Sequence, residues 1–262
     1  AETSYVECAE LIARWHNRGR LAYAVTPRFA VTSSDAQLDV AGRLAAEHAD
    51  IYVQTHLSEN HEEIAAVRAL FPDAATYTAV YDRFGLLGPR TLLGHCLHLD
   101  DSEVALLHER DAIAIWCPTS NNFLGSGLFD RDRLRAEPHP VRVGLATDVG
   151  GGTSYSMLQT AAEAYKVARL KGSNLTPFES FYLMTLGNAR ALKLEHEIGT
   201  LVAGSMADLV VLDLDGTPNL AHRIGAAHGD LESILFALTF LGDDRCVRAT
   251  YVAGKEAFSR NS

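Results

Sequence analysis

Polar residues of types that can do chemistry recur just after short apolar runs of this chain. His56 and Glu59 stand three residues apart after one such run, and His95 follows the next. Asp148 ends a later run and precedes three glycines. Imidazole and carboxylate groups are good ligands for zinc or iron, and a nearby carboxylate can carry a proton. These residue types indicate a metal ion that activates a water molecule for attack.

Each of these motifs, taken alone, also has a structural interpretation. His56 could be a strand-end histidine bonded to a carbonyl, and Glu59 could be an acid at a helix start, where the helix dipole favours it. Asp148 could cap a helix that begins near Thr153. The individual motifs leave both interpretations open.

A second group of residues is suited to holding a flat polar ring. Pro27-Arg28-Phe29 offers a guanidinium and an aromatic face at the end of an apolar run, a combination that suits a heteroaromatic ring with acceptor atoms. Asn121 belongs to a polar segment, 117–127, that we expect to be a loop lining a pocket. An ordinary connecting loop, and a surface salt bridge for Arg28, are the alternatives.

The elements that must position these residues are five short apolar runs alternating with helical segments. This alternation predicts an α/β fold with a mostly parallel sheet, covered on both faces because the runs lack in/out alternation. The runs are 21–25, 51–55, 91–93, 112–116 and 141–146.

Polar residues at the carboxyl ends of successive strands are typical of a (β/α)8 TIM-type barrel, which needs eight strands. Only five are counted, and no methionine stands at the start. We therefore expect the C-terminal part of a barrel, about strands 4–8, with the N-terminal strands missing.

The pattern changes after Asp148 and again near residue 199. The tail has β-rich stretches at 209–212 and 247–252 and a helical segment at 231–241. We expect two parts: a partial metal-dependent hydrolase barrel over 1–198, and strands and a helix of a small β-sandwich subdomain over 199–262.

Composition excludes several classes of protein. The 262 residues are 47% hydrophobic and 21% charged, which argues for a folded soluble protein and against disorder. A net charge of -10 without a cluster of Lys or Arg argues against a nucleic-acid partner, and no apolar run is long enough for a membrane span. Four cysteines without CxxC spacing predict a reducing, cytoplasmic location. Phosphate-loop, HExxH and GxSxG motifs are absent.

Taken together, the motifs resemble the amidohydrolase superfamily and, within it, the guanine deaminases. The resemblance covers nearly the whole chain, and it rests on the segments 27–29, 54–59, 94–96, 117–121, 126–127, 144–160, 199–204 and 207–213. It implies hydrolysis of guanine to xanthine and ammonia by a homodimer holding one zinc ion per subunit, or iron. This activity requires that the missing N-terminal part be present.

The resemblance also implies roles for individual residues. His56 and Asp148 would be metal ligands, and Asp148 would also accept a proton from the attacking water. Glu59 would carry protons to the purine, and His95 would orient the water. Arg28, Phe29 and Asn121 would hold guanine, with His56 and Glu59 also facing it.

The family's first-strand His-x-His is missing, in agreement with the strand count. Two rival interpretations remain. The first is another deaminase of the superfamily, acting on 8-oxoguanine, an adenosine derivative or an s-triazine. The second is an inactive fragment with half a metal site.

Overall fold

The computed structural model describes residues 1–260 and divides into two compact units. The first consists of Ala1–Trp116 and Phe129–Val143, and the second of Cys117–Leu128 and Gly144–Ser262. The boundary after residue 198 expected from the sequence remains a prediction.

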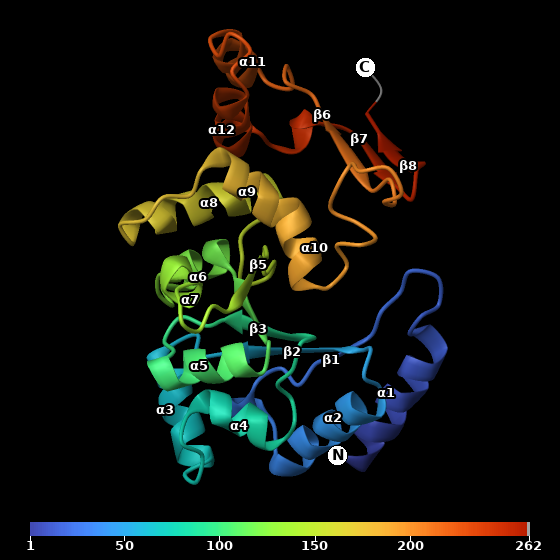
Figure 1. Cartoon of the computed structure of the whole chain (residues 1–262), viewed down its shortest axis with the longest axis vertical. Helices are drawn as coiled ribbons and strands as arrows, with labels where there is room; N and C mark the ends of the chain where they lie inside the picture. Colours follow the sequence, from blue (N-terminus) through green and yellow to red (C-terminus); the bar gives the residue numbers. More distant parts are fainter. Residues whose placement is uncertain (261–262) are drawn as a thin grey trace. The chain divides into compact units, whose positions relative to one another are not determined.

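The first unit is built on a parallel sheet, as the alternating apolar runs predict (Figure 1). Its strands follow the chain in the order β1-β2-β3-β4-β5, and β5 continues into the second unit. The register places Leu57, at the end of β2, opposite His95, at the end of β3. Polar residues that follow these two strands therefore share one edge of the sheet. The strands are β1 (Ala24–Val25), β2 (Tyr52–Leu57), β3 (Thr91–His95), β4 (Ile113–Trp116) and β5 (Arg142–Leu145).

Helices of the first unit connect these strands, with α2 and α4 lying below them in the view of Figure 1. Three of the helices begin with a capping box, in which the N-cap side chain and the third helical residue satisfy each other's backbone N–H groups. The boxes pair Ser34 with Gln37, Asn60 with Glu63, and Asp100 with Glu103. They set where α3 and α5 begin after the strand ends. The helices are α1 (Glu2–Trp15), η1 (Ala30–Thr32), α2 (Asp35–Glu47), α3 (His61–Leu70), α4 (Tyr77–Arg83), α5 (Asp101–Glu109) and α7 (Arg131–Leu134).

The second unit combines helices with a small antiparallel sheet of order β6-β7-β8. The strand bounds at 209–212 and 247–252 and the helix at 231–241 are those predicted from the sequence. A small core of Leu220, Ala237, Leu238 and Cys246 joins α11 and α12 to η3, directly before β7. The elements are α6 (Pro118–Leu124), α8 (Met157–Leu170), α9 (Pro177–Tyr182), the π-helix η2 (Leu183–Gly187), α10 (Asn188–Ala191), β6 (Leu209–Leu212), α11 (Pro218–Gly225), α12 (Leu231–Leu241), η3 (Asp244–Cys246), β7 (Val247–Val252) and β8 (Lys255–Ser259).

The expectation that 117–127 is a loop is wrong. Pro118 occupies the first turn of α6, where its fixed φ suits a helix and its missing N–H costs nothing. The helix ends at Gly125, whose φ of 70° gives the left-handed turn that stops it. Asn121 therefore lies on a short helix.

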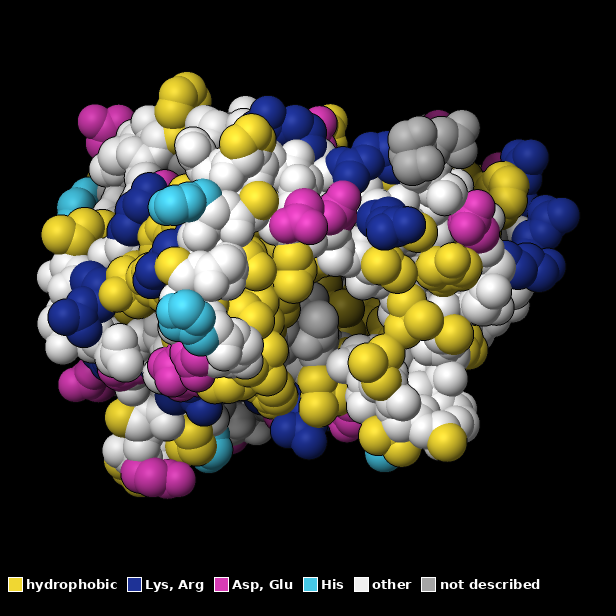
Figure 2. All heavy atoms as spheres, turned by 90° about the horizontal axis from the view of Figure 1, so that it is seen from above, with side chains coloured by type: hydrophobic (Ala, Val, Ile, Leu, Met, Phe, Trp, Pro, Cys, Tyr) yellow, Lys and Arg dark blue, Asp and Glu magenta, His cyan; other side chains and the backbone are white. Residues whose placement is uncertain are grey.

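Hydrophobic side chains reach the surface at several places on the face that Figure 2 presents. In the three-stranded sheet, Val210, Val211, Val252 and Phe258 are 42–57% exposed. Among residues 1–260, no helix combines the length and apolar character needed to cross a membrane. The four cysteines are all free thiols.

Candidate active site

His56 lies in β2, one residue before the strand ends, and is half-buried. Its Nδ1 atom lies 2.6 Å from the carbonyl oxygen of Arg28, and its backbone N–H donates to the same oxygen over 3.1 Å. Because a carbonyl only accepts, Nδ1 carries a proton, and in the neutral ring this places the lone pair on Nε2. The hydrogen bond from His56 to a backbone carbonyl, which a purely structural role would require, is therefore present. The same kind of hydrogen bond also orients histidines that bind metal ions.

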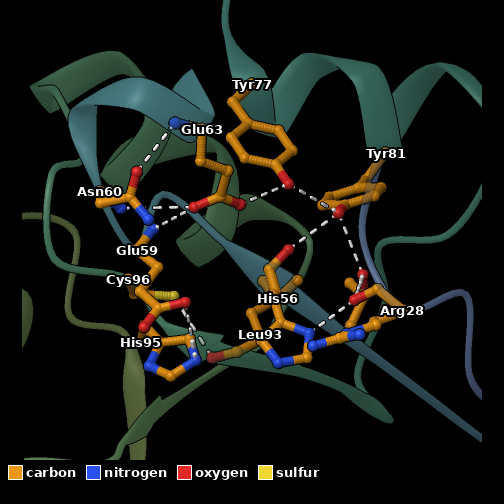
Figure 3. A network of polar contacts seen from close by, with 11 residues as sticks. Arg28, His56, Glu59, Asn60, Glu63, Tyr77, Tyr81, Leu93, His95 and Cys96 are labelled. Carbon is orange, nitrogen blue, oxygen red and sulfur yellow. Dashed lines mark hydrogen bonds and ion pairs between the residues drawn. The ribbon is translucent and has the colours of Figure 1, made fainter. Parts of the chain in front are cut away.

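His95 ends β3 and is almost completely buried. Its ring stacks on that of His56, with centroids 5.3 Å apart and planes 22° apart (Figure 3). Its Nε2 atom lies 3.6 Å from Oε2 of Glu59. The structure thus brings together the two histidines and the acid that the sequence singled out. His95 also has a φ of 74°, an uncommon conformation outside glycine that clusters at functional sites.

Glu59 lies in the turn between β2 and α3, before the helix cap. Its backbone N–H donates to Oε2 of Glu63 over 2.8 Å, while Asn60 is the N-cap and Glu62 and Glu63 are the acids of the first turn. The role of a helix-start acid is thus filled by other residues. The carboxylate of Glu59 is 17% exposed and faces His95.

Tyr81 was not singled out by the sequence, yet its hydroxyl contacts several parts of this site. It donates to the carbonyl of His56 over 2.8 Å, and accepts from the hydroxyl of Thr55 and the backbone N–H of Ala30, both over 3.0 Å. Burial raises the pKa of Tyr81 to about 12, so the hydroxyl keeps its proton at neutral pH.

Tyr77, one helical turn earlier on α4, extends the same network. Its hydroxyl donates to Oε1 of Glu63 over 2.7 Å and lies 3.2 Å from the hydroxyl of Tyr81. Burial raises the pKa of Tyr77 far above its usual range. Two sequence signals could have found this network: the capping-box spacing of Asn60 and Glu63, and the i,i+4 spacing of the tyrosines.

Arg28 and Phe29 lie beside His56, as a ring-binding pair would. The guanidinium carbon of Arg28 is 5.4 Å from the centroid of the Phe29 ring, and that ring is 5.6 Å from the ring of His56. Arg28 is exposed and Phe29 half-buried. A cation and an aromatic face therefore stand next to the histidine.

Asp148 follows β5 in the second unit and has a φ of 48°. The side-chain amide of Asn188 accepts from the backbone N–H of Leu145 over 2.8 Å and donates to its carbonyl over 2.9 Å. It thereby satisfies both backbone groups at the end of β5. The helix α8 begins at Met157 with Ser156 as its N-cap. The alternative in which Asp148 caps a helix that begins near Thr153 is therefore excluded, and the helical pattern predicted over 157–170 is confirmed.

The glycines after Asp148 let the chain fold back on the carboxylate. A Cβ atom at Gly151 would lie 2.7 Å from Oγ of Ser120 and 3.2 Å from Oδ2 of Asp148, and one at Gly152 would collide with the carbonyl of Thr147. Side chains are excluded at both positions.

Ser120 and Asn121, both on α6, are buried, with exposed fractions of 0% and 1%. The neighbouring Thr119 donates its hydroxyl to the carbonyl of Thr147 over 3.0 Å and so ties α6 to the segment that carries Asp148. Among the described residues the hydroxyl of Ser120 has no hydrogen-bond partner, and buried polar groups of this kind are where waters, ions or ligands bind.

Known proteins resemble this chain over nearly its whole length. The amidohydrolase family matches residues 1–257. The chain is 46% identical over 261 residues to a guanine deaminase of Escherichia coli, covering 100% of this chain and 59% of the relative. It superposes on a structure of E. coli guanine deaminase with a TM-score of 0.96 and 46% identity, covering 99% of this chain and 60% of that one.

A guanine deaminase from C. acetobutylicum with bound guanine in its active site superposes with a TM-score of 0.87 at 30% identity, covering 98% of this chain and 60% of that one. The chain thus spans about three fifths of the length of these relatives. A family match over residues 1–257, on an α/β fold with a parallel sheet, shows that the chain belongs to the amidohydrolase family.

Proposed function

We propose that this protein hydrolyses guanine to xanthine and ammonia with the help of one divalent metal ion, zinc. The observation that carries the proposal is the convergence of His56, Glu59 and His95 beside the pair Arg28 and Phe29. The similarity to guanine deaminases, one of them with guanine bound, supports this substrate.

The donor set fits such a metal ion. His56, His95 and Asp148 offer two imidazole nitrogens and a carboxylate, the ligand types that zinc takes in catalytic sites. The hydrogen bond from Nδ1 of His56 to the carbonyl of Arg28 favours the tautomer whose Nε2 is available to a metal ion. When bound, the metal lowers the pKa of a coordinated water from about 15.7 to about 7.

In this proposal Asp148 and His56 hold the metal, while His95 orients the attacking water or serves as a further ligand. Asp148 also accepts a proton from the water. Oxygen from the water joins the carbon that bears the exocyclic amine, and the amine leaves as ammonia. Both protons come from the attacking water. Glu59, as a general base and acid, takes one and delivers it to the adjacent ring nitrogen, and the proton accepted by Asp148 is returned so that Glu59 can deliver a second one to the leaving amine.

The remaining residues recognise the ring. The guanidinium of Arg28 faces the acceptor atoms of the purine, and Phe29 offers an aromatic face to the ring. Asn121 on α6 contributes an amide, and His56 and Glu59 also contact the substrate. An s-triazine or an adenosine derivative lacks part of this acceptor pattern, so guanine is the preferred substrate.

We extend the proposal to the architecture and assembly. The parallel sheet is interpreted as strands of a (β/α)8 barrel, and residues 199–262 as a β-sandwich subdomain. The protein acts as a homodimer in the cytoplasm. The expectation of missing N-terminal strands remains a prediction.

The test is ammonia release from guanine by the protein as its reading frame encodes it, with and without a chelator. The proposal expects conversion to xanthine that the chelator abolishes and zinc restores. A panel of 8-oxoguanine, adenosine and an aminated s-triazine should react far more slowly. If folded, zinc-loaded protein releases ammonia from one of these and none from guanine, the proposed substrate is wrong.

A further inference from the structure

We propose that Glu63, Tyr77 and Tyr81 are positioning residues for the deamination, acting through His56 and Glu59. This inference rests on the proposed function, because it assigns to a buried network the task of holding the two reacting side chains in place. Figure 3 shows the network running from the turn at Glu59 to the backbone of Arg28.

The first branch starts from the hydroxyl of Tyr81, which ties together two segments that face the substrate. It bonds the carbonyl of His56, the hydroxyl of Thr55 and the backbone N–H of Ala30. Thr55 Oγ1 also lies 3.3 Å from the carbonyl of Arg28, which orients the His56 ring. One hydroxyl thus joins the end of β2 to the segment that carries Arg28 and the aromatic ring after it.

The second branch starts from the carboxylate of Glu63. It accepts from the backbone N–H groups of Glu59 and Asn60 over 2.8 and 3.3 Å, and from the hydroxyl of Tyr77 over 2.7 Å. An ordinary capping box bonds only the N-cap residue, which is Asn60 here. The extra bond to Glu59 fixes the backbone of the proposed proton carrier itself.

Each hydroxyl has one proton to donate, and this fixes which atom donates in each hydrogen bond of the network. The hydroxyl of Tyr77 donates to Glu63, since a carboxylate is a stronger acceptor than a hydroxyl. The hydroxyl of Tyr81 donates to the carbonyl of His56. Tyr81 then accepts from Thr55 and Ala30, which uses both of its lone pairs. The hydroxyl proton of each tyrosine is thus committed to one acceptor, which favours a single arrangement of the network.

The polar groups of this network are buried, so each hydrogen bond in it matters for the local structure. Glu63, Tyr77 and Tyr81 are 7%, 5% and 0% exposed. Water cannot replace a lost partner at such positions, and a broken bond leaves a buried donor or acceptor unsatisfied. Removing one hydroxyl should therefore displace the segments that it holds.

The experiment uses two variants that keep side-chain shape, Tyr81→Phe and Glu63→Gln, and one matched control. Glu103 has the same place in the capping box of α5, is 5% exposed, and accepts from Asp100 and from both polar groups of Thr78. Glu103→Gln therefore reproduces the cost of altering a buried capping glutamate while leaving this network intact.

The two branches predict different kinetics in the protein as its reading frame encodes it. Tyr81→Phe should raise KM for guanine and lower kcat/KM by about 10- to 100-fold, because outer partners of an active site have effects of this size. Glu63→Gln should lower kcat with KM little changed, because it holds only the proton carrier. Glu103→Gln should keep both constants within about twofold of the parent.

A measurement independent of activity is the Nδ1 proton resonance of His56 in protein with labelled histidine. Tyr81→Phe should broaden or shift it, and Glu103→Gln should leave it in place. If Tyr81→Phe keeps both the resonance and KM of the parent, the inference is overturned. If the parent does not deaminate guanine, the proposed function fails, and the resonance alone decides the inference.

A melting curve of each variant identifies failures of folding. Where Tyr81→Phe does not fold, Tyr77→Phe replaces it, with an expected loss in kcat because Glu63 loses its buried donor. A kcat equal to that of Glu103→Gln would then contradict the inference.

Discussion

The backbone carbonyl of Arg28 lies 2.6 Å from Nδ1 of His56, while the guanidinium of the same arginine stands 5.4 Å from the centroid of the Phe29 ring. One residue thus has two separate tasks. Its backbone sets the tautomer of a proposed metal ligand, and its side chain is free to meet the substrate.

Arg28→Ala should separate these tasks, because the carbonyl remains when the guanidinium is removed. We expect KM for guanine to rise about 10- to 100-fold, the value of one or two hydrogen bonds from a charged group. Bound zinc should be unchanged by elemental analysis. The control is Arg83→Ala, which removes an exposed arginine paired with Asp35. Loss of zinc in Arg28→Ala would contradict the division of tasks.

Glu59→Gln should abolish most turnover and keep the fold. General acid–base groups contribute about 100- to 10,000-fold, so we expect a fall in kcat of that size. Zinc content and melting temperature should match the parent. Glu62→Gln, on an exposed acid three residues along, is the control and should be fully active. Retained turnover in Glu59→Gln removes the residue from the mechanism.

Asp148→Ala should lose the metal. Removing a direct ligand should cost more than the roughly 10- to 100-fold typical of outer partners, so zinc affinity should fall beyond this range. Elemental analysis after dialysis measures it. Asp213→Ala in the same unit removes a carboxylate that pairs with Arg260 and should keep the metal. Full zinc occupancy in Asp148→Ala would refute the assignment.

Gly152→Ala should damage the turn that follows Asp148. The added methyl would collide with the carbonyl of Thr147 and approach Oγ1 of Thr119 to 2.8 Å. Overpacking of this kind costs about 1–3 kcal/mol in the free energy of unfolding. At Gly225 a Cβ meets nothing within 4 Å, so Gly225→Ala should be neutral or slightly stabilising. Equal stability of the two variants in denaturant titration would count against this account.

Tyr81 should make the stability fall at high pH. Its pKa is raised by burial from 10.0 to about 12, so between these values the unfolded chain loses a proton that the folded chain keeps. The contribution of Tyr81 to the free energy of unfolding is therefore fully present below pH 10. It declines by about 1.4 kcal/mol per pH unit between pH 10 and pH 12. Tyr81→Phe, compared with the parent by denaturant titration over this range, should show a shallower decline. Parallel slopes would contradict the assignment.

Much of this molecule is determined by local sequence. Apolar runs without alternation predict buried parallel strands, and all five strands of the parallel sheet overlap those runs, because burial on both faces favours apolar residues. The ends of β2 and β3 then predict that His56, Glu59 and His95 lie at one edge of the sheet. Even α6 has local signals in Pro118 and Gly125, although the polar composition of 117–127 predicts a loop.

The tertiary structure alone decided how these side chains are held. The tautomer of His56 depends on a carbonyl 28 positions away, and the hydroxyl of Tyr81 meets the backbone of Ala30 across 51 positions. Such bonds have no period and no spacing in the sequence. They exist only because the parallel sheet brings distant strand ends and helices to one edge, where buried donors and acceptors must find partners.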